Sequence, residues 1–239
     1  MIKLHDVTFV MVETVCHDLA RLAMEDCKSK IEFEDVLLLT DKPEHFDGIS
    51  ARVVTVPNWP TKLDWCRAIW FEVPKHIHTS HMLLCQWDAG IWNPDDWTNE
   101  FMKYDFIGAL WEWQSFNRVC NTGFCLKSSR LARYIYYHRD KYPCYADTED
   151  GLLCRKYRPD LEKEGFTWSP EKLAHKFSFE GYGPAQRPPL ESHFGFHGLY
   201  NFKRVFEGGQ LETRAKLISE NVYLREKVQL LASDMERAI

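Results

Sequence analysis

Residues 81–94 read HMLLCQWDAGIWNP, and this stretch decides which fold the sequence favours. It opens with a short apolar run, residues 81–85, whose length and turn-bounded end predict a strand buried in a sheet. The run leads to one acid, Asp88, before a turn signal at Asn93-Pro94 and a helix-like stretch at 95–104. A single carboxylate at the carboxyl end of a strand, on the edge of an α/β sheet, is suited to hold a divalent cation or a diphosphate. The alternative is that Asp88 is an ordinary turn residue.

Apolar strands and helical segments alternate through the first half of the chain. We predict strands at residues 7–12, 36–39, 52–56 and 81–85, and helices at residues 16–31 and 62–73. Such alternation indicates βαβ units, and so an α/β fold with a mostly parallel, Rossmann-like sheet flanked by helices. No GxGxxG follows the first strand and no GxxxxGK[ST] occurs, which argues against common dinucleotide and P-loop sites.

The second half of the chain has a less regular pattern of strands and helices. We predict a strand at 104–111, a turn into a strand at 120–126, a helix at 128–138 and a helix start at 148–150. We therefore expect one domain over residues 1–206 and a C-terminal amphipathic helix over 207–239. Within 211–237, leucines fall at heptad position d and Asn221 at position a, which favours a coiled-coil homodimer. The alternative is a helix packed on its own domain.

Composition narrows the class of protein. The chain has 239 residues and a formal net charge of −5, which argues against a generic basic nucleic-acid binder but leaves a local basic patch open. Eight cysteines include no CxxC pair, so we expect buried free thiols, no structural zinc site and a cytoplasmic location. The start carries no signal-peptide pattern, and no run of about 18 apolar residues predicts a membrane span.

A series of short motifs follows in order over roughly residues 5 to 200. They are Gln86-Trp-Asp88, Asn93-Pro94, Trp97, Tyr104-Asp-Phe-Ile-Gly108, Asn121-Thr-Gly-Phe124, Glu149-Asp150, Ala174, Phe177-Ser-Phe-Glu180 and Phe194-Gly-Phe-His197. As an ordered set they resemble a GT-A-fold glycosyltransferase family that is catalogued as a domain of unknown function and is common in bacteria and viruses. The chain departs from that family at 109–111 and 120–124, loops that the resemblance places beside the sugar or the acceptor.

The resemblance implies a cation site made of Asp88 and His197. A sugar-nucleotide transferase must neutralise a departing diphosphate, and one carboxylate with diphosphate oxygens and waters suits Mn²⁺ or Mg²⁺. The alternative for His197 is a packed histidine beside Phe194 and Phe196. Donor-binding and sugar-pocket positions would be Thr14, Asp41, Lys62, Gln86, Trp87, Asn121 and Gly123. Thr14 could instead cap a helix, and Lys62 could be a solvated surface residue.

The resemblance also implies catalytic acids at Glu149 and Asp150. We expect Asp150 to be the base that takes the acceptor's proton in an inverting transfer, with Glu149 orienting the acceptor. The alternative is that both acids simply favour the start of a helix. The spacing alone is compatible with retaining transfer as well.

The function that follows is transfer of a hexose or similar sugar from a nucleotide sugar, expected to be a UDP-sugar, to an acceptor hydroxyl. The acceptor would be a saccharide or a hydroxymethylated base in viral DNA. The DNA alternative depends on residues 127–142, where Arg130, Arg133 and three further basic residues alternate with tyrosines near the proposed catalytic acids. The other interpretation of that region is an amphipathic helix with a solvated basic face. A catalytically inactive binding module of the same fold is the other alternative.

Overall fold

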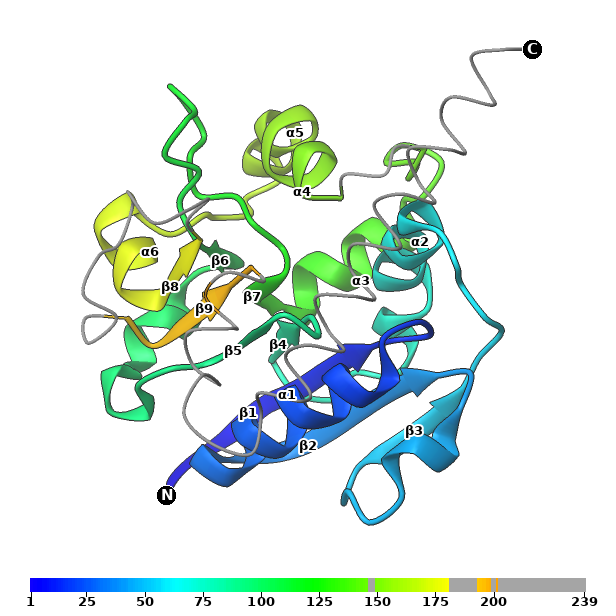
Figure 1. Cartoon of the computed structure of the whole chain (residues 1–239). Helices are drawn as coiled ribbons and strands as arrows, with labels where there is room; N and C mark the ends of the chain where they lie inside the picture. The colour runs from blue at the N-terminus through cyan, green and yellow to red at the C-terminus, as the bar shows by residue number, and fades with distance from the viewer. Residues whose placement is uncertain (146–148, 181–192, 199–200, 202–239) are drawn as a thin grey trace.

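The structure is a computed structural model that describes residues 1–145, 149–180, 193–198 and 201 (Figure 1). In chain order the main elements are β1 (Ile2–Val12), α1 (His17–Lys30), β2 (Ile31–Thr40), β3 (Arg52–Thr55), α2 (Lys62–Phe71), β4 (His81–Cys85), β5 (Ala89–Ile91), β6 (Phe106–Gly108), β7 (Phe124–Ser128), α3 (Ser129–Tyr137), α4 (Glu149–Gly151), α5 (Arg158–Lys163), α6 (Glu171–Phe177), β8 (Ser178–Glu180) and β9 (Gly195–His197). The predicted helix at 207–239 and its homodimer contact at 211–237 lie outside the described residues.

Six strands form the main sheet in the order β3-β2-β1-β4-β7-β6. The first four run parallel to one another, while β7 is antiparallel to both β4 and β6. The prediction of a mostly parallel α/β sheet flanked by helices is confirmed. A second, three-stranded sheet in the order β5-β9-β8 stands beside it and was not predicted.

Helices cover both faces of the main sheet. The connection from β1 to β2 and the connection from β3 to β4 run in opposite directions along the sheet, so right-handed crossovers put α1 and α2 on opposite faces. Figure 1 shows α1 across β1 and β2, with α2 and α3 together behind the sheet. The buried face of α1 is Ala20, Ala23, Met24 and Cys27, which follow helical spacing. No helix among the described residues has the length and apolarity needed to cross a bilayer.

One sequence prediction about local structure is wrong. Residues 95–104 do not form a helix of regular α type but two 3₁₀ segments, Pro94–Asp96 and Asn99–Lys103. The side chains of Asn93 and Thr98 accept hydrogen bonds from the backbone nitrogens of Asp95 and Glu100, and each starts a separate turn. Local side-chain capping therefore divides the segment, because Asn and Thr offer the backbone an alternative to helix continuation.

The carboxyl ends of β1, β2 and β4 meet at one edge of the main sheet. The parallel register pairs Val12 with Leu39, and the antiparallel register pairs Cys85 with Phe124 at the start of β7. The segments that follow β1, β2 and β4 and the loop that precedes β7 therefore share this edge, which we call the carboxyl edge. In open α/β sheets this is the edge where ligands bind.

Candidate active site

His197 is the centre of a polar cluster at the carboxyl edge. Its Nε2 lies 3.0 Å from Gln86 Oε1 and 3.4 Å from Asp88 Oδ1. Its Nδ1 lies 3.0 Å from Glu180 Oε1 and 2.9 Å from Asn121 Nδ2. Because the carboxylate of Glu180 can only accept, it requires a proton on Nδ1, and the amide nitrogen of Asn121 is then a close neighbour of that atom rather than a donor to it. The structure thus brings four of the predicted site residues together and adds Glu180.

The small sheet is what brings these side chains together. In its register, His197 pairs with Glu180 of β8 on one side and with Ala89 of β5 on the other. Asp88 immediately precedes β5. Three segments that are far apart in the sequence therefore present an imidazole and two carboxylates at one end of a single short sheet.

Gly123 is required for His197 to lie where it does. A Cβ atom on Gly123 would come within 2.2 Å of His197 Nε2, which no real side chain tolerates. The absence of a side chain at Gly123 therefore lets the imidazole of His197 pack against the backbone of this loop. Whether Gly123 also lines a sugar pocket stays a prediction.

The two carboxylates set the charge of His197. Burial disfavours the imidazolium, but the carboxylates of Asp88 and Glu180 outweigh it and raise the pKa of His197 to about 10. The imidazolium therefore compensates two acids in a pocket where each side chain is no more than 15 % exposed.

The donor set at this cluster fits a divalent cation. Asp88 Oδ1 is buried and forms no hydrogen bond with the described residues, its contact being the ion pair with His197. One carboxylate suits Mn²⁺ or Mg²⁺, and the imidazole of His197 can join it by releasing its Nε2 proton when a cation binds. Glu180 holds the far ring nitrogen, as carboxylates commonly do for metal-bound histidines. No group of three or more His, Cys, Asp and Glu side chains in the described part of the chain could hold a metal by itself. Further ligands would have to come from a diphosphate and water.

Asp150, the second residue of α4, lies close enough to Glu180 of this cluster for their charges to interact. Burial first, and then the charge of Glu149, raise the pKa of Asp150 to about 6, with a further contribution from Glu180. The backbone nitrogen of Gly151 donates to Asp150 Oδ1 at 2.8 Å, and the charge of Lys62 opposes the shift. A carboxyl group with a raised pKa beside other acids is typical of general bases and acids in enzymes.

Glu149 points into the protein rather than toward solvent. Its Oε1 accepts a hydrogen bond from Lys127 Nζ at 2.7 Å, and both side chains are about 2 % exposed or less. Lys127 belongs to β7, so the ion pair ties the Glu149-Asp150 turn to the main sheet. In this conformation Glu149 contacts Lys127, whereas the sequence prediction has it orient the acceptor.

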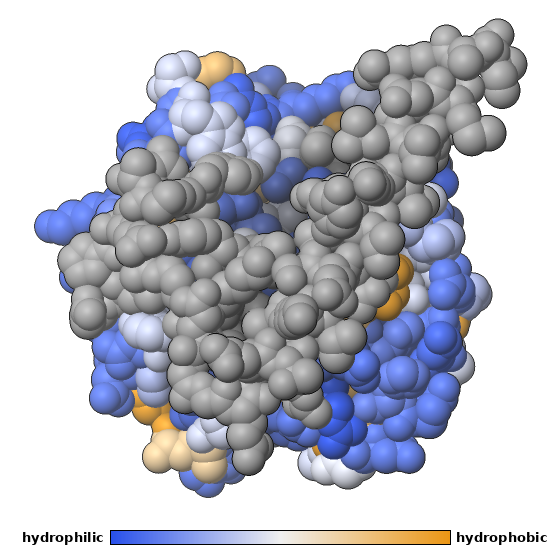
Figure 2. Space-filling view, in the orientation of Figure 1, coloured by the Kyte–Doolittle hydropathy of each residue, from blue (hydrophilic) through white to orange (hydrophobic). Residues whose placement is uncertain are grey.

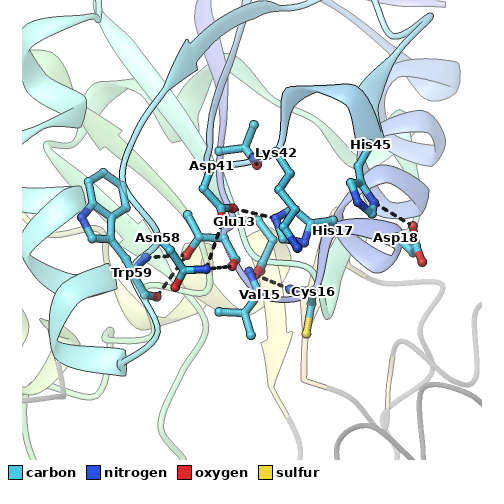
Figure 3. Close-up of polar contacts among 12 residues, drawn as sticks. Glu13, Val15, Cys16, His17, Asp18, Asp41, Lys42, His45, Asn58 and Trp59 are labelled. Atoms are coloured by element: carbon cyan, nitrogen blue, oxygen red, sulfur yellow. Dashed lines mark hydrogen bonds and ion pairs between the residues drawn. The ribbon is translucent and has the colours of Figure 1, made fainter.

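A second polar cluster, drawn in Figure 3, lies after β1 and β2. Asp41 stands between His17, at 2.7 Å, and Asn58, at 2.9 Å, and these contacts outweigh burial and lower the pKa of Asp41. Thr14 Oγ1 accepts from the backbone nitrogen of Trp59 and donates to its carbonyl oxygen, each at 3.0 Å. The hydroxyl of Thr14 therefore fixes the segment that leads to α2.

The other predicted donor residues lie at the same edge. Lys62 is exposed and is the first residue of α2, whose N-cap Thr61 forms a capping box with Asp64. Trp87 is half-buried and packs against the core between Gln86 and Asp88. Direct contact of either residue with a donor stays a prediction.

The structure separates the basic residues of the region 127–142. Ser128 pairs with His81, at the start of β4, which puts the beginning of α3 about 13 Å from the carboxyl edge. Arg130 and Arg133 line a surface cavity there with Thr79 and Ser80. Lys127 of the same region contacts Glu149, whereas Arg130 and Arg133 follow β7, which has by then run to the start of β4.

Sequence reasoning gave no individual role to Glu180, His17 or Asn58, and it counted Lys127 only among the basic residues of 127–142. Glu180 ends the apolar motif Phe177-Ser-Phe-Glu180, and an acid at the end of a short strand was the same signal that singled out Asp88. The other three residues carry no local signal, since their importance comes from partners distant in sequence.

With this geometry, the chain can be compared with known proteins. A family described as a protein of unknown function, DUF5672, matches residues 67–197, which include Asp88, Asp150 and His197. The match covers more than half of the chain, and the chain belongs to this family. No curated protein matches the sequence.

Several solved structures are similar in fold. A glycosyltransferase involved in the glycosylation of the major capsid of PBCV-1 has a TM-score of 0.52 and 12% identity, covering 84% of this chain and 98% of that one. GlyE of Streptococcus pneumoniae TIGR4, a glycosyltransferase, has a TM-score of 0.48 and 12% identity, covering 80% and 53%. The mannosyltransferase PcManGT of Pyrobaculum calidifontis, solved with GDP-Man and Mn²⁺, has a TM-score of 0.47 and 9% identity, covering 70% and 55%. This chain spans about half the length of the last two. We base the GT-A-like fold assignment on the first.

Proposed function

We propose that the protein is a metal-dependent glycosyltransferase that moves a hexose or similar sugar from a nucleotide sugar to an acceptor hydroxyl. The supporting observation is that the Asp88-His197-Glu180 cluster and a carboxyl group with a raised pKa, Asp150, lie close together at the carboxyl edge. A diphosphate leaving group and an acceptor proton are the two charges that sugar transfer must manage, and this arrangement offers a group for each. A UDP-sugar is the donor we expect.

Asp88 and His197 are the residues that would hold Mn²⁺ or Mg²⁺, which neutralises the departing diphosphate as a Lewis acid. Glu180 orients the imidazole through Nδ1, so that Nε2 faces Asp88. Lys62 begins α2 and can pair with a phosphate as a point charge at a helix N-terminus. The hydroxyl groups of the sugar and the nucleotide need neutral and acidic hydrogen-bonding partners. We assign this role to Gln86, Asn121 and the cluster around Asp41.

Asp150 acts as the base in this proposal. The acceptor oxygen forms a bond to the anomeric carbon, the bond from that carbon to the diphosphate oxygen breaks, and the acceptor's proton passes to Asp150. The attack on the opposite face from the leaving group gives inversion. Glu149 contributes in two ways: its charge raises the pKa of Asp150, and its ion pair with Lys127 ties the Glu149-Asp150 turn to β7.

The test compares donors and metals on the whole chain. Thermal unfolding with UDP, GDP, CMP and dTDP sugars, each with and without Mn²⁺, should reveal one donor that stabilises the protein only with the metal. Asp88→Asn should abolish that stabilisation and the turnover of the donor while the protein stays folded. Asp95→Asn, an exposed acid on the next turn, is the matched control and should change neither. Full turnover by Asp88→Asn would refute the cation site, and no binding or turnover of any donor would favour the inactive binding module.

A further inference from the structure

Residues 111–119, which connect β6 to β7, form an ordered projection that we call the aromatic loop. A β-bridge between Leu110 and Val119 closes its base, and the backbone nitrogen of Trp111 donates to the backbone carbonyl oxygen of Arg118 at 2.8 Å. Asn117 turns the chain with a φ of 49°, a left-handed conformation that asparagine tolerates better than most residues. In Figure 1 the loop is the green segment that extends beyond the sheet near α5 and α6.

The aromatic loop is attached to both halves of the proposed active site. At its base, the indole nitrogen of Trp111 donates to Glu180 Oε2 at 2.9 Å, and Glu180 in turn holds His197. The thiol of Cys120, which follows the loop, donates to the carbonyl oxygen of Asp150 at 3.4 Å. The base of the aromatic loop is therefore in contact with both Glu180 and the backbone of Asp150.

The loop displays large aromatic side chains at the surface. Phe116 is 58% exposed and Trp113 is 47% exposed, although such side chains normally provide the largest gain on burial. Trp113 stacks on Trp111 with ring centroids 5.3 Å apart and planes at 27°, and the guanidinium of Arg155 lies 4.5 Å from the centre of the Phe116 ring. These contacts with Trp111 and Arg155 fix the orientation of the two exposed rings. Figure 2 shows a small orange area at this end of the molecule among blue and near-white residues.

Part of the charge around these rings is compensated. Arg118 forms ion pairs with Glu112 and Glu171, at 2.5 and 3.0 Å. Arg155 donates to Gln114 Oε1 and covers Phe116. The groups left at the rim are neutral hydrogen-bonding side chains: Gln114, Ser115 and Asn117. Amides and hydroxyls both donate and accept, as the hydroxyl groups of a sugar require.

We propose that the aromatic loop is the acceptor subsite and that it binds a neutral saccharide, with the C–H face of a pyranose ring on Trp113 or Phe116. Burial of that apolar face against a fixed ring supplies binding free energy, while the neutral rim satisfies the hydroxyls. This inference rests on the proposed glycosyl transfer, because it assigns the acceptor of that reaction.

A nucleic-acid acceptor fits the same surface less well. Aromatic rings can stack bases, but single strands also require a groove of cations that follows the phosphates. The arginines of the aromatic loop region are paired with acids or engaged with Gln114, and Arg130 and Arg133 lie at the opposite edge of the sheet. The observations therefore favour a saccharide.

The experiment measures acceptor binding and donor turnover separately in the full chain. The probes are methyl glycosides and disaccharides of glucose, galactose and mannose, titrated by tryptophan fluorescence and by transfer assays. Trp113→Ala and Phe116→Ala should each raise the acceptor KM at least tenfold and leave hydrolysis of the donor without acceptor unchanged. Tyr137→Ala, an aromatic residue of α3 that is 73% exposed, is the matched control and should leave both unchanged.

The outcomes separate the two proposals. Saccharide binding that is lost in Trp113→Ala, with no donor hydrolysed by any form of the protein, would support the acceptor subsite and overturn the proposed transfer. Donor hydrolysis without binding of any saccharide would overturn the subsite alone. Single-stranded or duplex DNA that serves as acceptor and loses binding in Trp113→Ala would overturn the choice of a saccharide.

Discussion

Replacing Asp150 by asparagine should make the protein more stable near neutral pH while it removes the proposed base. Burial and the charge of Glu149 raise the pKa of Asp150 from 3.8 to about 6. The folded state thus holds this proton more tightly than the unfolded chain does. Folding stability is unaffected by Asp150 below about pH 4, falls as the pH rises to about 6, and stays lower above that.

The size of the effect follows from the shift in pKa. Two units correspond to about 3 kcal/mol, and since Asp150 retains some exposure to solvent we expect about 1–3 kcal/mol. Asp150→Asn removes the charge but keeps an oxygen for the backbone nitrogen of Gly151, which donates to Oδ1 at 2.8 Å. In a chain of this size the gain should raise the melting temperature by roughly 2–12 °C near pH 8 and by nothing near pH 4.

Asp105→Asn is the control with the opposite sign. Asp105 is buried too, but hydrogen bonds from Arg130, Ser128 and the backbone of Thr167 outweigh that burial and lower the pKa of Asp105. The asparagine variant should therefore be less stable than the wild type near pH 8, and the loss should fade as the pH falls. Melting curves by circular dichroism at both pH values measure the two variants side by side.

The Asp150→Asn substitution should lower the activity while it raises the stability near pH 8. Loss of a general base lowers kcat by about 10²–10⁴-fold, and in the wild type kcat should rise with pH up to about 6 and then level off. An Asp150→Asn protein that is less stable than the wild type near pH 8, or equally stabilised at both pH values, would show that the buried charge is not what destabilises this site.

Three further substitutions probe the same site. Glu180→Gln should weaken Mn²⁺ binding by about 10–100-fold, measured as the metal concentration needed for thermal stabilisation, because the imidazole loses the carboxylate that orients it; an unchanged concentration would contradict this. Gly123→Ala should abolish metal-dependent stabilisation, since its Cβ would lie 2.2 Å from His197 Nε2, and persistence of that stabilisation would show that the loop yields easily. Lys127→Met should cost about 3–5 kcal/mol in urea unfolding by leaving a buried carboxylate uncompensated, and the double variant with Glu149→Gln should recover most of it; no recovery would mean that Lys127 acts by packing.

The larger elements could be predicted from the sequence because each carries its own pattern. The run at 81–85 became β4 with the same bounds, and the helical spacing at 16–31 and 62–73 gave α1 and α2. The small sheet could not be predicted, since its three strands have three residues each and exist through pairing with one another. A strand of that length has too few positions to show a period of two.

The candidate site likewise contains residues that local sequence could identify and residues that it could not. Asp88 follows β4 and could be identified as an acid near a strand end, whereas His197 was identified only through the family resemblance. Local sequence says nothing about a contact between residues so far apart. The basic region at residues 127–142 has a related explanation, because composition shows the basic residues but not that Lys127 contacts Glu149 while Arg130 and Arg133 follow beyond the end of β7.

Packing of β9, as much as hydrogen bonding, determines where the imidazole of His197 lies. Side chains alternate along a strand, so Gly195 shares a face with His197 while Phe196 points the other way. A Cβ on Gly195 would come 2.1 Å from the ring of Phe124, and one on Gly123 would meet His197 itself. Two glycines thus let β9 and the loop before β7 approach closely, with Phe124 beneath them. A shift of β9 by one residue would turn His197 to the other face and drive Phe196 against that loop. The position of the imidazole is therefore set by the apolar layer under the site before any ligand arrives.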